Sequence, residues 1–553
     1  MKKHVFNQRK QYSIKLLKWR YHHTFKINFT MIKIKQFLII SFFCFYYTTP
    51  NAYSQKATNP LIFADVPDMS IIRVNDNYYM SSTTMHMCPG VPVMKSNDLT
   101  NWKIIGYAYD ILEDIDATRL THGKSDYGRG SWASCLRFHH GEYYLSTFSH
   151  TTGKTYIFKT KNIESGQWKR FAFSPALHDH SIFFDDDGKI YIVWGAGTLK
   201  IAELKEDFSG LKEGSERVLI ENASAPAGAS IMLPAEGSQL FKVNGKYYLF
   251  NITWPWGGMR TVLVHRADNI HGPWEGRVAF QDRGIAQGGI IDMPDGRWFA
   301  YLFRDYGAVG RIPYLVPVRW EDGWPILGID GKAPDTLDLP PSRGLIPGIV
   351  ASDDFDYVGE PPTLSPVWQW NHNPDNRYWS LTQRKGYLRH TTSNITDNFE
   401  FAHNTLTQRT IGPACVGSIK MDVSHMKDGD FAGLALIQKN YGLVGVKYEN
   451  GVKRLVMINA QKDNEPQEIE NIPLEKNIVY LKAVCYFENM TDTAAFYYST
   501  NGTDWQRIGN TLKMRYNLAH FMGYRFGLFN YATRLAGGYV DFDWFRIQEV
   551  YKP

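Results

Sequence analysis

A short pattern of a tight turn followed by an aromatic strand occurs five times in the first three hundred residues. Asn-Gly and Asp-Gly supply the positive φ angles that a tight hairpin needs, and the alternation that follows is typical of a strand packed on one face. The spacing of the copies is close to the size of a four-stranded propeller blade. We therefore expect an all-β chain that begins with a five-bladed β-propeller, with a β-sandwich of five similar hairpins as the alternative. The copies are NDNYYMSS from Asn75, HGEYYLST from His140, DGKIYIVW from Asp187, NGKYYLFN from Asn244 and DGRWFAYL from Asp295.

Eleven or twelve residues before the second aromatic of each copy stand Asp68, Trp132, Asp179, Glu236 and Gln287. The starts of the innermost strands of a propeller converge on its axis, so residues at one phase of the repeat should meet in space. Three of these five residues are carboxylates, and we interpret them as a site. A single such acid would otherwise be a turn residue bonded to its own backbone. The acidic tract 185–187 lies in a hairpin turn, away from the axis, and we expect it to be solvated.

Around these acids the sequence resembles glycoside hydrolase family 43, whose members are inverting β-xylosidases, α-L-arabinofuranosidases and endo-arabinanases on a five-bladed propeller. The resemblance implies roles for three residues. NPLIFADVPDMSIIRV places the general base at Asp68, although Met69 replaces a family proline, and Asp65 is the rival. LHDHSIFFDDDGKIYIVWG assigns Asp179 as the carboxylate that orients the acid and modulates its pKa, and PAEGSQLFKVNGKYYLF assigns Glu236 as the general acid. The similarity runs over roughly residues 59 to 330.

The residue types suit glycoside hydrolysis with inversion. Protonated Glu236 would donate to the leaving glycosidic oxygen while Asp68 activates a water on the opposite face of the sugar. A separation of about 6.5 to 9.5 Å between the two carboxyls leaves room for that water. A negative charge at Asp179 would favour the protonated form of Glu236.

Further side chains are candidates for substrate binding. Trp132 could stack on the sugar, and Arg311 in GRIPY resembles the family arginine that hydrogen-bonds the terminal sugar. Gln287 shares the phase of the acids, and Trp254 with Trp256 could form a wall of the cleft. Each also has a structural alternative, because strand tryptophans commonly pack and arginines commonly form ion pairs.

The sequence predicts neither a metal nor another cofactor. Many family members have a His before Gln-Gly-Gly that helps to hold a central calcium, but here this residue is Ala286. The cysteines that follow the leader form no Cys-x-x-Cys pair, and their wide spacing resembles neither a zinc site nor a disulfide scaffold. We expect buried free thiols at Cys88, Cys135, Cys415 and Cys485.

The net charge of +6 is concentrated in residues 1–55, which hold ten Lys or Arg and no acidic residue. The remainder has 51 basic against 55 acidic residues, so it lacks the basic footprint of a nucleic-acid binder. Within the leader, lysines after Met31 precede the apolar run FLIISFFCFYY and small residues through Ala52, as in a secretory signal. We expect Met31 to be the true start and the protein to be periplasmic, with a cell-surface or extracellular location, a short membrane anchor or a lipid anchor at Cys44 as alternatives.

Three further segments follow the leader in the predicted organisation. The propeller is expected over 56–332, a proline-rich linker over 333–351 and a β-sandwich over 352–553, where runs such as AGLALIQK and IVYLKAVCYF alternate as short strands. This last segment resembles the concanavalin-A-like domain of xylosidase-type family members. It has no second acid pair, so we expect it to support catalysis by narrowing the pocket; glycan binding by the sandwich alone is the alternative.

These features predict an exo-acting hydrolase that releases terminal α-L-arabinofuranosyl residues from arabinoxylan or xyloglucan side chains. A β-xylosidase or a bifunctional xylosidase and arabinofuranosidase is the alternative. A glycan-binding propeller without catalysis is a remote one. The expected partner is a plant polysaccharide or oligosaccharide, with no nucleic acid and no stable membrane span after signal cleavage.

Overall fold

The computed structural model describes residues 56–461 and 465–550, and this part of the chain is built from β-strands. The predicted leader, with its secretory signal, lies outside the described residues. Within them, no helix is long and apolar enough to cross a membrane. The helical elements of this part are single 3₁₀ turns: η1 (Ala225–Ala227), η2 (Gly307–Val309), η3 (Phe399–Phe401) and η4 (Glu488–Met490).

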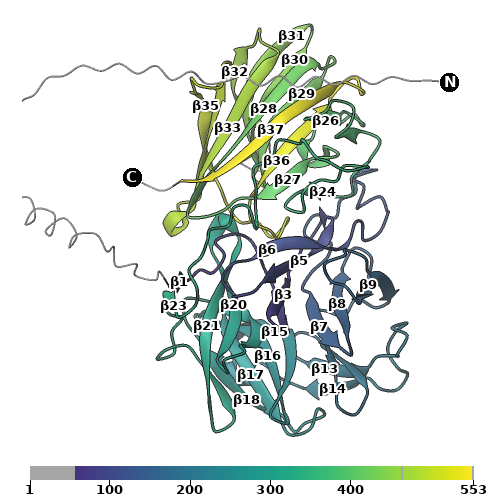
Figure 1. The fold of residues 1–553 in the computed structure, drawn as a ribbon, viewed down its shortest axis with the longest axis vertical. Coiled ribbons are helices and arrows are strands. Elements are labelled where there is room, and N and C mark those ends of the chain that lie inside the picture. Colours follow the sequence, from purple (N-terminus) through teal and green to yellow (C-terminus); the bar gives the residue numbers. More distant parts are fainter. Residues whose placement is uncertain (1–55, 462–464, 551–553) are drawn as a thin grey trace, which may run out of the picture. The chain divides into compact units, whose positions relative to one another are not determined.

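Five four-stranded antiparallel sheets form the first half of the described chain, which confirms the predicted five-bladed propeller (Figure 1). The first strands of successive blades contact one another in a closed ring, in the order β2, β7, β11, β15, β19 and back to β2. These strands are therefore the innermost ones. Blade 1 contains β2 (Ser70–Val74), β3 (Asn77–Ser81), β5 (Gly90–Ser96) and β6 (Lys103–Tyr109); blade 2 contains β7 (Cys135–His139), β8 (Glu142–Ser149), β9 (Lys154–Thr160) and β10 (Lys169–Phe173); blade 3 contains β11 (Ser181–Phe184), β12 (Ile190–Trp194), β13 (Leu199–Glu203) and β14 (Arg217–Ile220); blade 4 contains β15 (Ile231–Val243), β16 (Lys246–Pro255), β17 (Thr261–Ala267) and β18 (Glu275–Phe280); blade 5 contains β19 (Ala286–Asp292), β20 (Trp298–Asp305), β21 (Arg311–Glu321) and β22 (Trp324–Leu327).

The repeated hairpin turns have the backbone that their sequences predict. Asn75 and Asn244 have φ angles of 54° and 49°, and Gly188 and Gly296 have φ angles of 80° and 86°. One expectation about these turns is wrong. Asp185 is buried and accepts hydrogen bonds from the Tyr247 hydroxyl at 2.8 Å and from Lys242 Nζ at 2.9 Å, so it links blade 3 to blade 4 instead of being solvated. Its neighbours at 186 and 187 are exposed.

Two larger sheets form the predicted sandwich after the propeller (Figure 1). A short strand of the propeller segment, β4 (Met87–Cys88), pairs with β24 at the edge of the larger sheet and so connects the two domains by backbone hydrogen bonds. The eight-stranded sheet has the order β32 (Gln467–Pro473), β31 (Val452–Asn459), β30 (Gly442–Glu449), β29 (Asp430–Ile437), β36 (Arg525–Ala532), β27 (Leu406–Arg409), β24 (Gln369–Asn371) and β4; the seven-stranded sheet has the order β25 (Trp379–Ser380), β26 (Leu388–Thr391), β37 (Tyr539–Glu549), β28 (Ala414–His425), β33 (Ile478–Tyr486), β34 (Thr493–Ser499) and β35 (Gln506–Lys513).

The proline-rich segment between the domains packs along the propeller. It contains a two-residue strand, β23 (Thr336–Leu337), which pairs with β1 (Ala57–Thr58), although the prolines argue against a strand there. The side-chain amide of Asn59 donates to the carbonyls of Leu315 in blade 5 and of Pro334 in this segment, each at 2.8 Å. The segment therefore ties the start of the propeller to its last blade.

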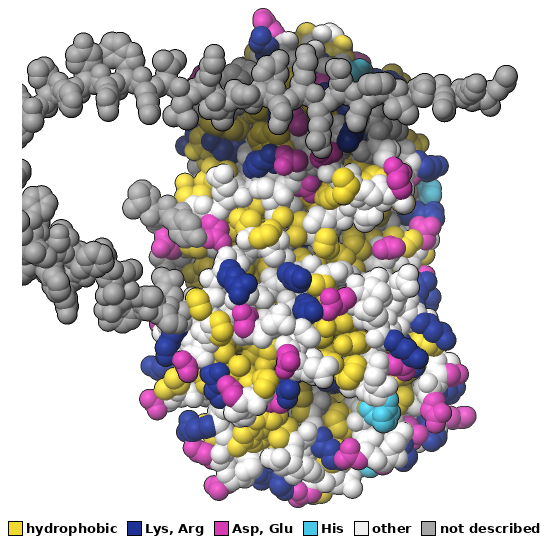
Figure 2. Space-filling view, viewed as in Figure 1, with side chains coloured by type: hydrophobic (Ala, Val, Ile, Leu, Met, Phe, Trp, Pro, Cys, Tyr) yellow, Lys and Arg dark blue, Asp and Glu magenta, His cyan; other side chains and the backbone are white. Residues whose placement is uncertain are grey.

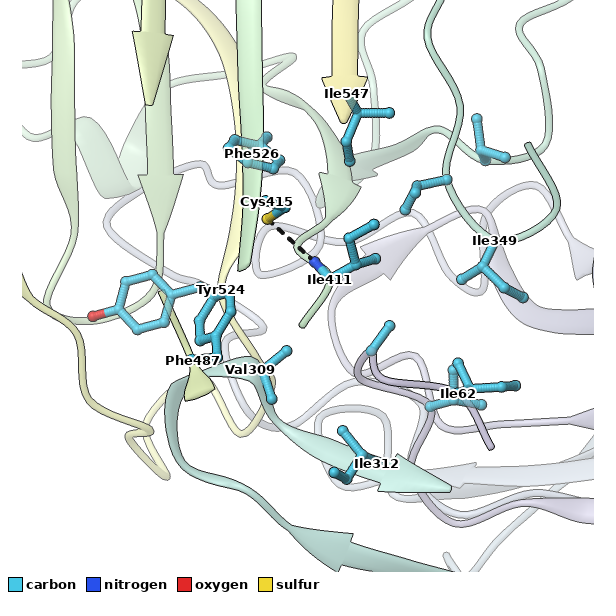
Figure 3. Packing of buried hydrophobic residues seen from close by; sticks show 14 of the residues in the cluster. Ile62, Val309, Ile312, Ile349, Ile411, Cys415, Phe487, Tyr524, Phe526 and Ile547 are labelled. Atoms are coloured by element: carbon cyan, nitrogen blue, oxygen red, sulfur yellow. Dashed lines mark hydrogen bonds between the residues drawn. The ribbon is translucent and has the colours of Figure 1, made fainter. Parts of the chain in front are cut away.

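One hydrophobic cluster runs from the propeller into the sandwich. Figure 3 shows Ile62, Val309 and Ile312 of the propeller segment in the same cluster as Ile411, Cys415 and Phe526 of the sandwich. The four described cysteines are all buried and free, which confirms the prediction. On the face drawn in Figure 2, basic and acidic side chains are interspersed, in keeping with the near-neutral charge expected of this part.

Candidate active site

The starts of the innermost strands carry a left-handed backbone at one equivalent position. The strand registers align Asp68, Asp179, Gly237 and Gln287, whose φ angles are 50°, 47°, 68° and 51°. A non-glycine residue in this region costs of order 1 kcal/mol or more and is common at functional sites. Glu236 stands one residue before the shared position, because β15 has a register shift between Glu236 and the start of its regular pairing. All four aligned residues line one pocket.

Asp68 is buried in an ion pair. Both of its carboxylate oxygens lie close to Arg311 Nη1, at 2.9 Å and 3.0 Å, and Oδ2 also accepts a hydrogen bond of 2.6 Å from the Thr83 hydroxyl. Arg311 is 4% exposed, and its Nε and Nη2 have no partner among the described residues. Since Oδ1 has fewer partners than Oδ2, it is the oxygen better placed to accept a proton. Both unpaired donors of Arg311 are buried.

Asp65, the rival for the base, is occupied elsewhere. Its Oδ1 accepts from the backbone N–H of Arg311 at 2.8 Å, and its Oδ2 accepts from the backbone N–H of Gly523 at 2.9 Å. A Cβ at position 523 would lie 2.1 Å from the Val309 carbonyl, so this approach requires glycine. Asp65 therefore fastens a sandwich segment to the propeller beside Arg311.

Glu236 lies next to two further ionisable side chains. Its Oε2 is 3.0 Å from His178 Nε2, which is also 4.0 Å from Asp179 Oδ2. Among the described residues, one group of side chains is close enough together to hold a metal ion, with its nitrogen and oxygen atoms within 4.8 Å of one another: His178, Asp179 and Glu236. Because His178 and Glu236 already contact each other directly, we interpret the group as an acid with its partners and not as a metal site.

The carboxyl of Asp179 does not carry the fixed negative charge expected from the sequence. Burial raises the pKa of Asp179 to about 7; the imidazole of His178 opposes the rise and the charge of Glu236 adds to it. Burial lowers the pKa of His178, but the hydrogen bond to Glu236 and the charge of Asp179 outweigh this and raise it to about 9. Asp179 thus exchanges protons near neutral pH instead of carrying a permanent charge. The group combines a cationic imidazole with two carboxyls.

A loop of the sandwich, residues 514–524 between β35 and β36, reaches into this site. The Phe521 ring stacks on Trp132 with centroids 5.1 Å apart at an interplanar angle of 22°. The Arg311 guanidinium lies 4.7 Å from the centre of the Phe521 ring, and the Tyr516 ring lies 6.3 Å from it. Phe521 itself has a φ of 53°. The sandwich therefore supplies an aromatic wall against two residues that the sequence assigns to substrate binding.

Comparison with known proteins identifies the architecture. Residues 57–325 match glycosyl hydrolases family 43, and residues 352–548 match the beta xylosidase C-terminal concanavalin A-like domain. A solved structure, described as a bifunctional GH43-CE protein of Bacteroides eggerthii, is 66% identical over 90% of this chain, with a TM-score of 0.89. The chain belongs to glycosyl hydrolase family 43. It spans 64% of the length of that bifunctional protein.

Curated relatives of the family cover most of the chain. A beta-xylosidase of Formosa agariphila is 29% identical, over 88% of this chain and 89% of its own length. A non-reducing end alpha-L-arabinofuranosidase of Bacteroides ovatus is 27% identical, over 73% of this chain and 78% of its own length. This chain is therefore a family 43 glycosidase of the xylosidase and arabinofuranosidase type.

The remaining candidate side chains are placed differently from one another. Gln287 is buried at the pocket, and a Cβ on Gly237 would lie 2.8 Å from its Cγ, so the glycine makes room for it. Trp254 is half-buried, donates to the Gly258 carbonyl at 3.1 Å and packs under the Arg260 guanidinium. Trp256 is 64% exposed. The recorded contacts of Trp254 therefore hold the blade edge and do not join it to the carboxylates.

The residues near the axis do not fit the calcium that many members of family 43 hold. Ala286 is fully buried and offers only a methyl group. Two residues after Asp68, Asp179 and Gly237 stand Ser70, Ser181 and Gln239. The Arg137 guanidinium donates to all three side chains, to Ser181 Oγ at 2.8 Å, to Ser70 Oγ at 3.4 Å and to Gln239 Oε1 at 3.3 Å. A cation of the protein itself thus already bridges the innermost strands of four blades.

Sequence reasoning missed three contributors to this family 43 site. His178 stands directly before Asp179, and the His-Asp pair was the available signal. Thr83 follows β3 with no distinguishing pattern. Phe521 lies in a sandwich segment of ordinary composition, so nothing in the sequence indicates that it meets Trp132.

Proposed function

We propose that this protein is an inverting, exo-acting pentosidase in which Asp68 is the general base and Glu236 the general acid. The observation that carries the proposal is the meeting of the two domains at the acids: Asp68 and Asp179 line the pocket at the start of the propeller's innermost strands, and Phe521 of the sandwich covers Trp132 and the Asp68 partner Arg311. Such a wall favours a sugar at a chain end over an internal one. The acid pair argues against a glycan-binding propeller, which needs no proton donor.

In the proposed reaction, Glu236 gives its proton to the glycosidic oxygen as the bond to the anomeric carbon breaks. A water attacks that carbon from the opposite face and passes its proton to Asp68. Arg311 fixes the Asp68 carboxylate through its Nη1. Asp179 and His178 set the charge around the acid.

We infer β-xylosyl residues as the first substrate and α-L-arabinofuranosyl residues as the second. The relatives favour the β-xylosidase alternative over the arabinofuranosidase first expected, because the xylosidase is more similar and covers more of both chains. The two sugars expose similar hydroxyl patterns, so activity on both is consistent with one pocket. We further propose, from the leader sequence, that the enzyme is exported and meets plant oligosaccharides outside the cytoplasm.

The test compares kcat/KM on nitrophenyl β-xylopyranoside, nitrophenyl α-L-arabinofuranoside and xylo-oligosaccharides labelled at the reducing end. We expect release of single xylose units from the unlabelled end, with the xyloside preferred. Proton NMR of the first product should show the inverted anomer. Initial retention of configuration would refute the roles of Asp68 and Glu236, and internal cleavage would refute the exo mode.

A further inference from the structure

His178 contacts the acid more closely than any other charged group recorded near it. Its Nε2 lies 3.0 Å from Glu236 Oε2, and the two side chains are 28% and 21% exposed, so the contact is largely shielded from solvent. The residue directly precedes Asp179, and its backbone carbonyl accepts a hydrogen bond of 3.1 Å from Gly195 N–H. The main chain at His178 is therefore fixed independently of the acid.

Aromatic rings pack around the imidazole, and its recorded side-chain hydrogen bond goes to Glu236. The rings of Phe148, Trp132 and His150 surround it, with centroids 5.5 Å, 6.1 Å and 6.0 Å away. Asp179 lies at 4.0 Å, beyond hydrogen-bond length. The imidazole N–H at Nε2 is thus directed to Glu236.

We propose that His178 is the positioning residue of the general acid: its Nε2–H donates to Glu236 Oε2, so that the acidic proton is carried on Oε1 toward the leaving group. This inference rests on the proposed function. When Oε1 gives its proton to the glycosidic oxygen, the hydrogen bond from the imidazolium becomes an ion pair and stabilises the carboxylate that forms, as donors aimed at developing charge do. The proton lost by Glu236 is restored from water after the products leave.

The charges around His178 support a donor at neutral pH. Asp179 and Glu236 face it directly, Asp68 acts on it from farther away, and His150 is the other titratable ring beside it. Burial lowers the pKa of the imidazole, but the hydrogen bond to Glu236 and the charge of Asp179 outweigh this and raise it to about 9, which favours the form with hydrogen on both ring nitrogens. In that form Nε2 is a donor to Glu236 Oε2 at the 3.0 Å contact.

The test uses His178→Phe, which keeps an aromatic ring without a donor, and His178→Gln, whose side-chain amide can place an N–H near the same point. Each is assayed on xylobiose, a poor leaving group, and on nitrophenyl xyloside, a good one. We expect His178→Phe to lower kcat on xylobiose about 10²-fold or more, with a much smaller loss on the aryl glycoside and little change in KM. His178→Gln should restore most of the kcat on xylobiose that His178→Phe loses. Its kcat should also not fall at alkaline pH through deprotonation of the imidazole, as that of the wild type does.

His150→Phe is the matched control, because His150 faces the same ring but makes no recorded contact with Glu236. Any loss it causes should be equal for the two substrates. Equal losses on both substrates in His178→Phe, or a His178→Gln variant no better than His178→Phe, would overturn the proposal.

A second measurement is independent of activity. Nitrogen-15 NMR of the histidines should find an elevated pKa for His178 in the wild type and a fall toward the ordinary value of about 6.5 in Glu236→Gln. An unchanged His178 pKa in that variant would refute the hydrogen bond. If wild-type enzyme cleaves neither pentoside while this NMR result holds, the proposed substrate fails and the pairing of His178 with Glu236 stands.

Discussion

Removal of the Phe521 ring tests whether the sandwich contributes to catalysis. In Phe521→Ala the stacking on Trp132 is lost, which is worth about 0.5 to 1.5 kcal/mol for an aromatic pair. The contact with Arg311 is also lost, and because that guanidinium is 4% exposed, its value is near the desolvated figure of about 2 kcal/mol. If both contacts hold the pocket in its working form, the combined cost of about 2.5 to 3.5 kcal/mol corresponds to a loss of about 70- to 400-fold in kcat/KM.

The assay is kcat/KM on xylobiose together with product analysis on a labelled longer oligosaccharide. The removal of the wall should also allow some cleavage inside the chain. Leu518→Ala in the same loop is the control, because Leu518 is 70% exposed and surface substitutions of this kind change energies by about 0.5 kcal/mol or less. A Phe521→Ala enzyme within about threefold of wild type, with unchanged products, would show that the two contacts do not shape the transition state.

Three further predictions concern the acids and the metal. Glu236→Gln should nearly abolish cleavage of xylobiose but retain much more activity on a nitrophenyl glycoside, whereas Asp68→Asn should lose activity on both substrates equally. The rates of both variants on both substrates check this. The same dependence on the leaving group in both variants would contradict the assigned roles. Chelator treatment should leave most activity intact because Ala286 cannot ligate calcium, and a loss restored by calcium alone would contradict this. The pKa of Asp179 rises from near 4 in the unfolded chain to about 7 in the folded protein, so between these pH values the folded state binds more protons. The contribution of Asp179 to stability is therefore lost as pH rises from 4 to 7. The Tm of Asp179→Asn should fall less than that of wild type over this range, and parallel curves of Tm against pH would contradict the assignment.

The fold could be predicted because the evidence for it is local. Each hairpin turn needs positive φ at fixed positions. The sequence indicates these positions by the residues that tolerate positive φ, which are Asn75, Asn244 and the glycines of the other turns. Five copies then imply five sheets, whatever their side chains contact. Asp185 shows the limit of this reasoning, since its burial depends on Tyr247 and Lys242 of the next blade, which no local pattern reveals.

The candidate site could be predicted only where it follows the repeat. Asp68, Asp179 and Gln287 share a register and a left-handed backbone, so counting from the hairpins reaches them. Glu236 is displaced by one residue by the irregular pairing of β15, and a count that allowed one residue of slack still reached it. His178 lies beside a predicted acid, but adjacency in sequence says nothing about a contact with Glu236 across two blades.

Phe521 could not be predicted, and the reason also explains how a domain without an acid pair can act on the chemistry. The carboxylate of Asp65 accepts from the backbone of Arg311 on one side and from the backbone of Gly523 on the other. The loop that carries Phe521 and the strand that carries Arg311 are thus fixed to the same buried group. A displacement of the sandwich loop must therefore either break one of these hydrogen bonds or move the start of β21, and with it the partner of Asp68. Asp65, which is not a catalytic residue in the proposed reaction, therefore couples the position of the Phe521 loop to the orientation of Asp68, the proposed base.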